Sequence, residues 1–231
     1  MGNTILEARH IDKYFHDPVG VKVLSDISFT IDKGEFVTVT GRSGCGKSTL
    51  LYILSTMDTD YAGELLIDNV SMTGKPEPEL ARVRNEKIGF VFQFHYLLNE
   101  FTVLQNVMLP GLKLGRYTKQ EVQQRAMERL TMLGIEKLAC KKANQVSGGE
   151  KQRIAIARAL INDPHIIMGD EPTGNLDKKN SEVVFDIFKR LAEEYKQTLL
   201  IVTHDQEFAA RTQRNIQMED GKIIQYSQKA Q

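Results

Sequence analysis

A run of glycines between a strand-like and a helix-like segment constrains this chain more than any other feature. The run reads Gly41-Arg42-Ser43-Gly44-Cys45-Gly46-Lys47-Ser48. Residues 35–40 before it are rich in aromatic and β-branched side chains, which indicates a buried strand. Leu50, Leu51 and Leu54 after it recur at helical spacing. The chain therefore contains a strand-to-helix turn of the kind that holds a bulky anion.

The residue types in this turn suit a phosphate group. Gly41, Gly44 and Gly46 allow positive φ and a close backbone approach, so successive N–H groups can point at phosphate oxygens. The helix that begins near Lys47 adds the positive end of its dipole. The spacing fits the Walker A pattern, in which the lysine reaches the β- and γ-phosphates and the Ser48 hydroxyl ligates Mg²⁺. The flanking strand and helix disfavour a glycine-rich turn that binds nothing.

Composition sets the wider limits. The 231 residues suffice for one domain with an inserted lobe, and 30 basic residues balance 30 acidic ones, so no overall attraction to nucleic acid is expected. The two cysteines, Cys45 and Cys140, lie 95 positions apart and one is inside the glycine-rich turn, so we expect no disulfide framework and a reducing cytosol. We expect no secretory signal, and the apolar runs are too short to span a bilayer. If this protein functions at a membrane, we expect another chain to hold it there.

The N-terminal region reads as sheet. Ile27, Phe29 and Ile31 alternate with polar residues, which is typical of a half-buried strand. Phe15 has two open interpretations, stacking on a nucleotide base or ordinary core packing. Further strands are predicted at 64–68 and 88–92, with a surface loop at 74–78 between them.

Residues 94–161 read as a helical lobe, since strand signals largely vanish there. Val122, Ala126, Leu130 and Leu133 repeat at helical spacing, and we expect the Met127 and Met132 thioethers to pack rather than bind a ligand. We therefore divide the single domain into residues 1–93 (β subdomain and first part of the core), 94–161 (inserted helices) and 162–231 (second part of the core).

A second helix start in this lobe is suited to anions. Ser147 is placed as an N-cap and Glu150 completes a capping-box spacing, while Gly148 and Gly149 expose backbone N–H groups. Taken alone, this pattern also fits a well-capped helix and nothing more.

Polar side chains follow three predicted strands. Gln93 ends the strand at 88–92, Asp170 and Glu171 end a buried strand at 165–169, and His204 follows a buried strand at 198–202. Ligands of open α/β sheets lie beyond such strand ends. One carboxylate can help to hold Mg²⁺ and the other can accept a proton from water that attacks the γ-phosphate.

The remaining C-terminal predictions concern packing. A helix at 180–195 carries an apolar stripe of Val183, Val184, Ile187, Phe188 and Leu191. A hairpin is expected at the dipeptide Asp220-Gly221, followed by a frayed tail at 227–231.

In this order, the motifs resemble the nucleotide-binding subunit of ATP-binding cassette (ABC) transporters over nearly the whole chain. Glu-Pro-Thr-Gly-Asn-Leu-Asp and Phe-Gln-Phe-His-Tyr-Leu-Leu are similar to the lipoprotein-releasing and macrolide-exporter branch. The resemblance implies an α/β fold. It would have a parallel-sheet core of the P-loop NTPase (RecA-like) type, an N-terminal antiparallel β subdomain and an inserted α-helical subdomain. It also implies an ATPase on the cytoplasmic face of the inner membrane that drives permeases of the FtsX, MacB or LolCE type.

The resemblance also assigns roles by position. Phe15 would stack on adenine, Gln93 would touch Mg²⁺ and the attacking water, Asp170 would support Mg²⁺, Glu171 would be the general base, and His204 would contact the γ-phosphate. Other nucleotide contacts would come from Gly41, Arg42, Ser43, Gly44, Cys45, Gly46, Lys47, Ser48 and Thr49. Two copies would pair over two ATP molecules, each covering its partner's nucleotide with Ser147, Gly148, Gly149 and Glu150, with Asp177 at the seam.

Two other classes of protein contain the same type of ATP-binding domain and are alternatives to a transporter subunit. Nucleic-acid ATPases of repair usually insert a long coiled coil or metal-binding segment between the two glycine motifs, and ribosome-acting ABC proteins usually carry two cassettes. This chain has neither feature. It departs from the family pattern in Phe15 (usually tyrosine), Glu150 (usually glutamine) and Gly169 (usually larger), and none of these changes removes a catalytic group.

Overall fold

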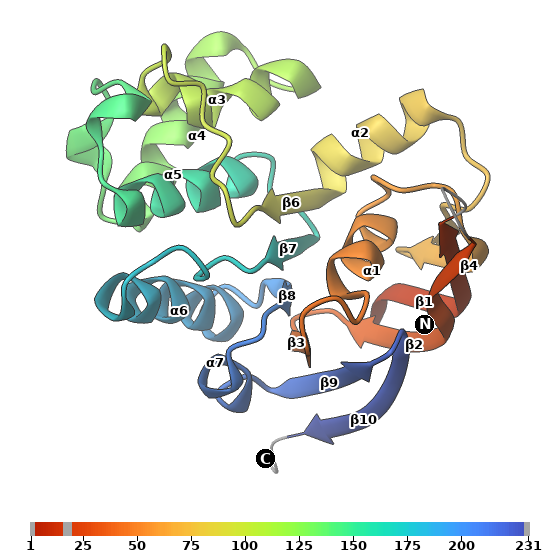
Figure 1. The fold of residues 1–231 in the computed structure, drawn as a ribbon. Coiled ribbons are helices and arrows are strands. Elements are labelled where there is room, and N and C mark those ends of the chain that lie inside the picture. Colours follow the sequence, from red (N-terminus) through yellow and green to blue (C-terminus); the bar gives the residue numbers. More distant parts are fainter. Residues whose placement is uncertain (1–2, 16–19, 229–231) are drawn as a thin grey trace.

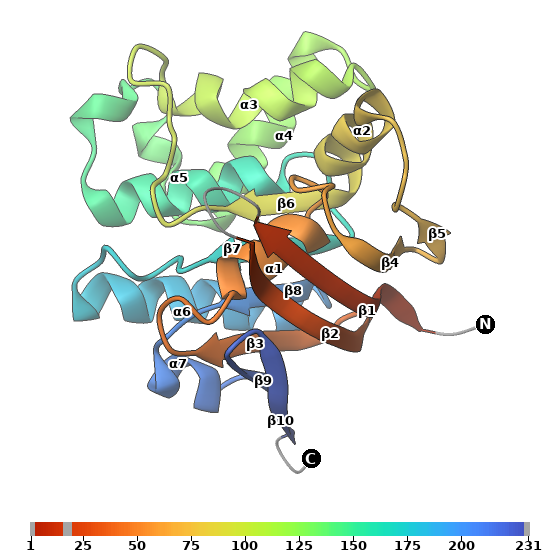
Figure 2. The same cartoon turned by 45° about the vertical axis from the view of Figure 1, so that its right-hand side comes forward.

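The computed structural model describes residues 3–15 and 20–228, and it contains two sheets that pack around shared helices (Figures 1 and 2). The smaller sheet is antiparallel, in the order β2-β1-β4-β5. Its strands are β1 (Thr4–Phe15), β2 (Val21–Asp32), β4 (Ala62–Ile67) and β5 (Val70–Ser71). Ile27, Phe29 and Ile31 are buried as their alternation predicts. The N-terminal antiparallel subdomain is thus confirmed.

The larger sheet has the order β10-β9-β3-β8-β7-β6, and all of its pairs are parallel except β9 with β10. Its strands are β3 (Phe36–Gly41), β6 (Ile88–Val91), β7 (Ile166–Asp170), β8 (Thr198–Val202), β9 (Arg214–Glu219) and β10 (Lys222–Gln228). The parallel strands place their carboxyl ends at one edge of the sheet. That edge is where the predicted site residues meet.

Helices cover both faces of the larger sheet (Figure 1). They are α1 (Lys47–Leu54), α2 (Glu77–Lys87), α3 (Val103–Leu114), α4 (Lys119–Met132), α5 (Gly148–Leu160), α6 (Lys178–Glu193) and α7 (Gln206–Ala210), with single 3₁₀ turns at Glu136–Leu138 and Ala143–Gln145. The α3, α4 and α5 helices form a lobe beyond β6, and its core joins α6 through residues such as Val122, Leu130 and Ile154. Met127 and Met132 pack against this core, as predicted. The predicted insertion of helices between sheet strands is confirmed.

The prediction for residues 74–78 is wrong at its C-terminal end. The expected loop at 74–78 ends in a helix, because Pro76 is the N-cap of α2 and Pro78 lies in its first turn. The sequence does not reveal α2 because Leu80 is its only buried residue among those described, so no apolar stripe is present. Prolines fit a first turn, where the backbone N–H groups have no helical partner.

The C-terminal predictions need smaller corrections. Val183 of α6 is 40% exposed, and Phe185 is buried in its place. The hairpin at Asp220-Gly221 is confirmed, since both residues have positive φ and join β9 to β10. The frayed tail predicted at 227–231 is wrong for Ser227 and Gln228, which pair with Asn215 and Arg214 of β9, and residues 229–231 lie outside the described part.

Candidate nucleotide site

The glycine-rich loop joins β3 to α1 and is shaped by close backbone contacts. Gly44 and Gly46 have φ of 81° and 99°, backbone angles that residues with a side chain rarely adopt. A Cβ at Gly41 would lie 2.3 Å from the Met218 carbonyl oxygen. The Lys47 ammonium donates to the carbonyl oxygens of Gly41 at 2.8 Å and Arg42 at 2.9 Å. The loop therefore curls around the buried Lys47 ammonium. It leads into α1, whose N-terminus has no side-chain cap.

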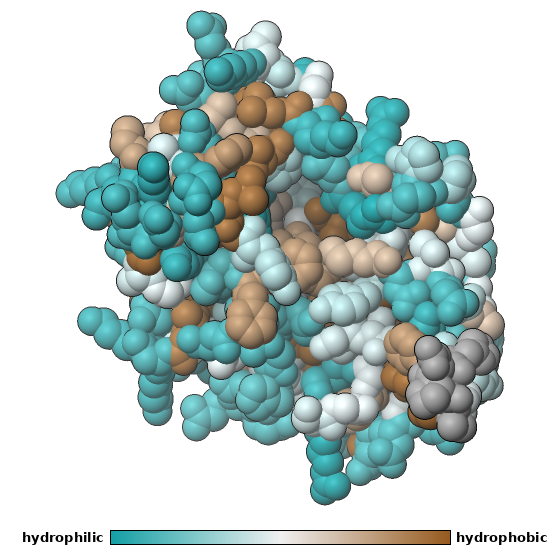
Figure 3. All heavy atoms as spheres, turned by 45° about the horizontal axis from the view of Figure 1, so that its top comes forward, coloured by the Kyte–Doolittle hydropathy of each residue, from teal (hydrophilic) through white to brown (hydrophobic). Residues whose placement is uncertain are grey.

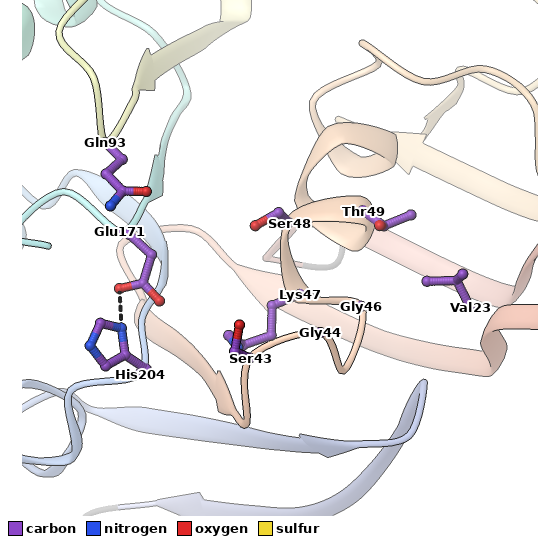
Figure 4. Close-up of a pocket in the computed structure, with 10 residues that line it drawn as sticks. All are labelled: Val23, Ser43, Gly44, Gly46, Lys47, Ser48, Thr49, Gln93, Glu171 and His204. Atoms are coloured by element: carbon purple, nitrogen blue, oxygen red, sulfur yellow. Dashed lines mark ion pairs between the residues drawn. The ribbon is translucent and has the colours of Figure 1, made fainter. Parts of the chain in front are cut away.

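A pocket of about 490 Å³ opens over this loop (Figure 4). It is lined by Val23, Ser43, Gly44, Gly46, Lys47, Ser48, Thr49, Gln93, Glu171 and His204. Gln93 follows β6, Glu171 follows β7, and His204 follows β8. The structure thus brings together residues up to 181 positions apart in the chain, from Val23 to His204.

Asp170 lies behind Ser48 as the last residue of β7. It is buried, and its Oδ1 accepts a hydrogen bond of 3.0 Å from the Ser48 hydroxyl. Burial raises the pKa of Asp170, although hydrogen bonds from Ser48 and Tyr52 oppose this rise. Sequence reasoning missed Tyr52, but its position four residues after Ser48 places both on the same face of α1.

Glu171 is held firmly at the pocket wall. Its φ of 46° is unusual for a residue with a side chain, and strain of this kind often marks functional sites. Its N–H donates to the Val202 carbonyl at 2.9 Å. Its Oε2 lies 2.9 Å from His204 Nδ1 and accepts a 3.3 Å hydrogen bond from Thr203. Figure 4 shows the other carboxylate oxygen directed toward the loop.

Several predicted residues do not line this pocket. Gly41 and Arg42 face Lys47, and the buried Cys45 has its Sγ 4.0 Å from Lys47 Nζ. Phe15 is 47% exposed, so the core-packing interpretation is wrong. The Lys13 ammonium lies 5.0 Å from the centre of the Phe15 ring.

The second glycine motif lies away from this pocket, at the start of α5. Ser147 accepts from the Glu150 N–H, and the Glu150 carboxylate accepts from Ser147 at 2.7 Å (N–H) and 2.8 Å (hydroxyl). These hydrogen bonds lower the pKa of Glu150. Ser147 and Gly148 are exposed, and nothing lies within 4 Å of a Cβ built at Gly148. The capping box is confirmed, and the helix start is open to a ligand from outside this copy.

Asp177 lies close to this second motif. It is the N-cap of α6 and accepts from the backbone and side-chain N–H groups of Asn180 at 2.8 and 2.9 Å, which lowers the pKa of Asp177. A Cβ on Gly149 would lie 2.2 Å from the Asn180 amide oxygen, so a larger residue there would displace the Asn180 side chain that Asp177 holds.

Fold and site together define a P-loop nucleotide-binding protein, and comparison with known families specifies its class. The family described as ABC transporter matches residues 24–174, more than half of the chain. The chain belongs to this family, as its order of motifs predicted. It is an ATP-binding ABC protein with ATPase activity.

Similar proteins narrow the class further. The chain is 45% identical over 225 residues to lipoprotein-releasing system ATP-binding protein LolD 1 of Chlorobium chlorochromatii. That alignment covers 96% of this chain and 92% of the relative. The chain is 47% identical over 220 residues to LolD of Porphyromonas gingivalis, which covers 95% and 99%. A dimeric ATP-binding cassette, MJ0796, solved with ADP and Pi, is 38% identical with a TM-score of 0.89, covering 97% of this chain and 98% of that one.

Proposed function

We propose that this chain is the ATPase subunit of a lipoprotein-releasing transporter, in which two copies close over two ATP molecules and drive a membrane permease. The observation that supports this most strongly is the pocket itself. It combines a phosphate loop with Lys47, a carboxylate, a histidine and a glutamine at one sheet edge. The similarity to lipoprotein-releasing relatives supports the branch.

Within the pocket, the loop backbone and Lys47 bind the phosphates. The start of α1 adds the partial positive charge of its N–H groups. We assign adenine stacking to the ring of Phe15, because it is exposed beside Lys13. Arg42, Ser43, Cys45 and Thr49 complete the loop that encloses the phosphates.

The oxygen groups beside the loop fit Mg²⁺. Ser48 and Asp170 are already paired through oxygen atoms, and Gln93 offers an amide oxygen across the pocket. Mg²⁺ prefers oxygen ligands and usually takes one or two carboxylates together with substrate phosphates. Among the described residues no group of three His, Cys, Asp or Glu side chains is placed to hold a metal ion. When bound, Mg²⁺ supplies charge neutralisation at the β- and γ-phosphates.

Glu171 has the geometry of a general base. Thr203 and His204 both contact Oε2 and orient the carboxylate, so we assign Oε1 as the atom that accepts a proton from the attacking water. His204 is 68% exposed and can contact the γ-phosphate from the same side. Gln93 lines the pocket opposite Ser48 and can orient that water.

The partner copy supplies the cover. Ser147 and Gly148 are exposed at the start of α5, whereas Gly149, which the sequence predicted to expose its N–H, is buried against Asn180. A helix start binds anions. We assign this surface to the ATP held by the partner, with Glu150 fixing the cap and Asp177 at the seam. A dimer of this kind gives the second anion site a ligand that one copy lacks.

A groove beside the site suits the permease. It has a volume of about 440 Å³ and runs between α2, β6, α3 and α5, with Phe92, Tyr96 and Pro110 among its lining residues. Figure 3 shows apolar side chains around a hollow on this face. Phe94 and Tyr96, one and three residues after Gln93, are 61% and 65% exposed. We propose that a cytoplasmic segment of a permease of the LolCE, MacB or FtsX type docks here.

Membrane attachment then depends on that permease. No helix within residues 3–15 and 20–228 is long and apolar enough to cross a bilayer. The similarity to lipoprotein-releasing relatives supports our proposal that the chain works on the cytoplasmic face of the inner membrane, with no nucleic-acid partner.

Purification from native membranes tests this function. The tagged chain should co-purify with a permease that has few spans and a large domain on the far side of the membrane. Its sedimentation with membranes should disappear when that permease is deleted. Sedimentation with ribosomes, independent of the permease, would contradict the proposal.

A further inference from the structure

Asn175 lies in the loop between Glu171 and α6, and the function proposed above gives it no role. Its side chain meets Gln93 twice. Asn175 Nδ2 donates to the Gln93 backbone carbonyl at 3.2 Å, and Asn175 Oδ1 accepts from Gln93 Nε2 at 3.4 Å. The two residues are 82 positions apart, so the fold alone brings them together.

These two contacts determine which way both amides face. A backbone carbonyl only accepts hydrogen bonds, so the Asn175 group beside it must be the NH₂. The other Asn175 atom is then the oxygen, which requires a donor from Gln93. Gln93 must therefore present Nε2 to Asn175 and keep its Oε1 for the opposite side.

The opposite side is the nucleotide pocket. Figure 4 shows the Gln93 amide oxygen pointing across the pocket toward Ser48, with the nitrogen on the other side. An oxygen is the atom that Mg²⁺ prefers, whereas an amide nitrogen would repel a cation. The orientation set by Asn175 is thus the one that metal binding needs.

The loop around Asn175 is built to hold this contact. Gly174 N–H donates to the Glu171 carbonyl, and Leu176 N–H donates to the Thr173 carbonyl, both at 3.0 Å. A Cβ on Gly174 would lie 3.1 Å from Gln93 Nε2, so a larger residue would crowd the amide. The loop therefore packs directly on the glutamine.

The backbone after Gln93 is anchored separately. The Arg158 guanidinium of α5 donates to the carbonyl oxygens of His95 at 2.7 Å and Tyr96 at 2.8 Å. These contacts restrain the main chain two and three residues after Gln93, whose own carbonyl accepts from Asn175. Asn175 also contacts the amide end of the Gln93 side chain.

We propose that Asn175 is a positioning residue for Gln93, which turns the glutamine amide oxygen toward the Mg²⁺ site. The inference rests on the proposed role of Gln93 as a metal contact. It assigns no direct contact between Asn175 and ATP.

Binding of a fluorescent, non-hydrolysable ATP analogue tests this without turnover. Its affinity is measured with Mg²⁺ and with excess EDTA for the parent protein and for Gln93→Ala, Asn175→Ala and the double variant. Asn99→Ala, at an exposed loop asparagine, is the matched control. Loss of one hydrogen-bonding partner should reduce the Mg²⁺-dependent gain in affinity by about threefold to tenfold in Asn175→Ala.

The double variant identifies the route of the effect. If Asn175 acts through Gln93, the double variant should match Gln93→Ala, because residues that act as a unit are not additive. Affinity in EDTA and the melting temperature should stay unchanged in all variants. A normal Mg²⁺ gain in Asn175→Ala, or additive losses in the double variant, would overturn the inference while Gln93 keeps its role. A normal gain in Gln93→Ala would instead overturn the proposed role of Gln93, and this inference with it.

Discussion

Glu171 combines an unusual backbone with a fixed carboxylate. Its positive φ is stabilised by the hydrogen bond to Val202, and Thr203 and His204 fix Oε2. The sequence predicts the residue because an acidic pair ends a buried strand beside a phosphate loop. It does not predict the φ of 46° or the Thr203 contact, which depend on how β7 and β8 pair.

Replacing Glu171 with glutamine tests the assigned base. Glutamine keeps the shape and can still accept from Thr203, but it cannot take up a proton. Glu171→Gln should bind ATP and dimerise, while phosphate release falls by about 100-fold or more. Phosphate release and light scattering measure the two effects. Glu219→Gln, at an exposed position on β9, should behave as the parent, and normal turnover in Glu171→Gln would refute the assignment.

At the scale of elements, two helices begin with nearly the same capping box. Ser147 and Glu150 cap α5, and Thr118 and Glu121 cap α4 with matching bonds of 2.7 and 2.8 Å. The sequence predicts the α5 cap from its spacing. It cannot separate a structural cap from a ligand site, because both need the same residues.

Comparing the N-caps of α4 and α5 distinguishes a structural cap from a cap that also contacts a ligand. Ser147→Ala and Thr118→Ala should each cost about 1 kcal/mol of unfolding free energy, because each removes one N-cap hydrogen bond. Only Ser147→Ala should lower ATP hydrolysis, by about tenfold, since its hydroxyl would also face the partner's ATP. Urea unfolding measures the free energy of unfolding, and phosphate release measures the rate of ATP hydrolysis. Equal activity in the two variants would show that Ser147 is only a cap.

The α6 helix shows where periodicity misassigns a residue. Val183 fits the stripe by spacing but is 40% exposed. Phe185 instead packs with its ring centre 6.3 Å from that of Phe36 and 4.9 Å from that of Phe208. The stripe alone cannot predict this, because the position of Phe208 depends on α7, which the sequence does not indicate.

Phe185 and Val183 therefore differ in their effect on stability. Phe185→Ala should lower the free energy of unfolding by about 3–5 kcal/mol, because it leaves a cavity in the core. Val183→Ala should change it by less than about 0.5 kcal/mol. Both changes in unfolding free energy are measured from the midpoints of denaturant unfolding, with the slopes of the transitions unchanged. Equal destabilisation by the two changes would contradict the packing described here.

At the scale of the whole molecule, the order of motifs in the sequence predicts most of the fold. Parallel strands gather their carboxyl ends, so Gln93, Glu171 and His204 line one pocket with Lys47. Contacts between distant loops, such as Asn175 with Gln93, are not predicted because no local pattern encodes them. The structure of one copy also leaves Ser147 outside the pocket. Under the proposed function, a complete site requires two copies.

Mixing two inactive variants tests this central claim most directly. Lys47→Ala removes the phosphate-binding cation, and Ser147→Arg blocks the cover that one copy provides for its partner. Each variant alone should fail to hydrolyse ATP, whereas their mixture should recover activity, because each mixed dimer contains one site with both Lys47 and Ser147 intact. Normal hydrolysis by Ser147→Arg alone, or no recovery on mixing, would contradict the shared site.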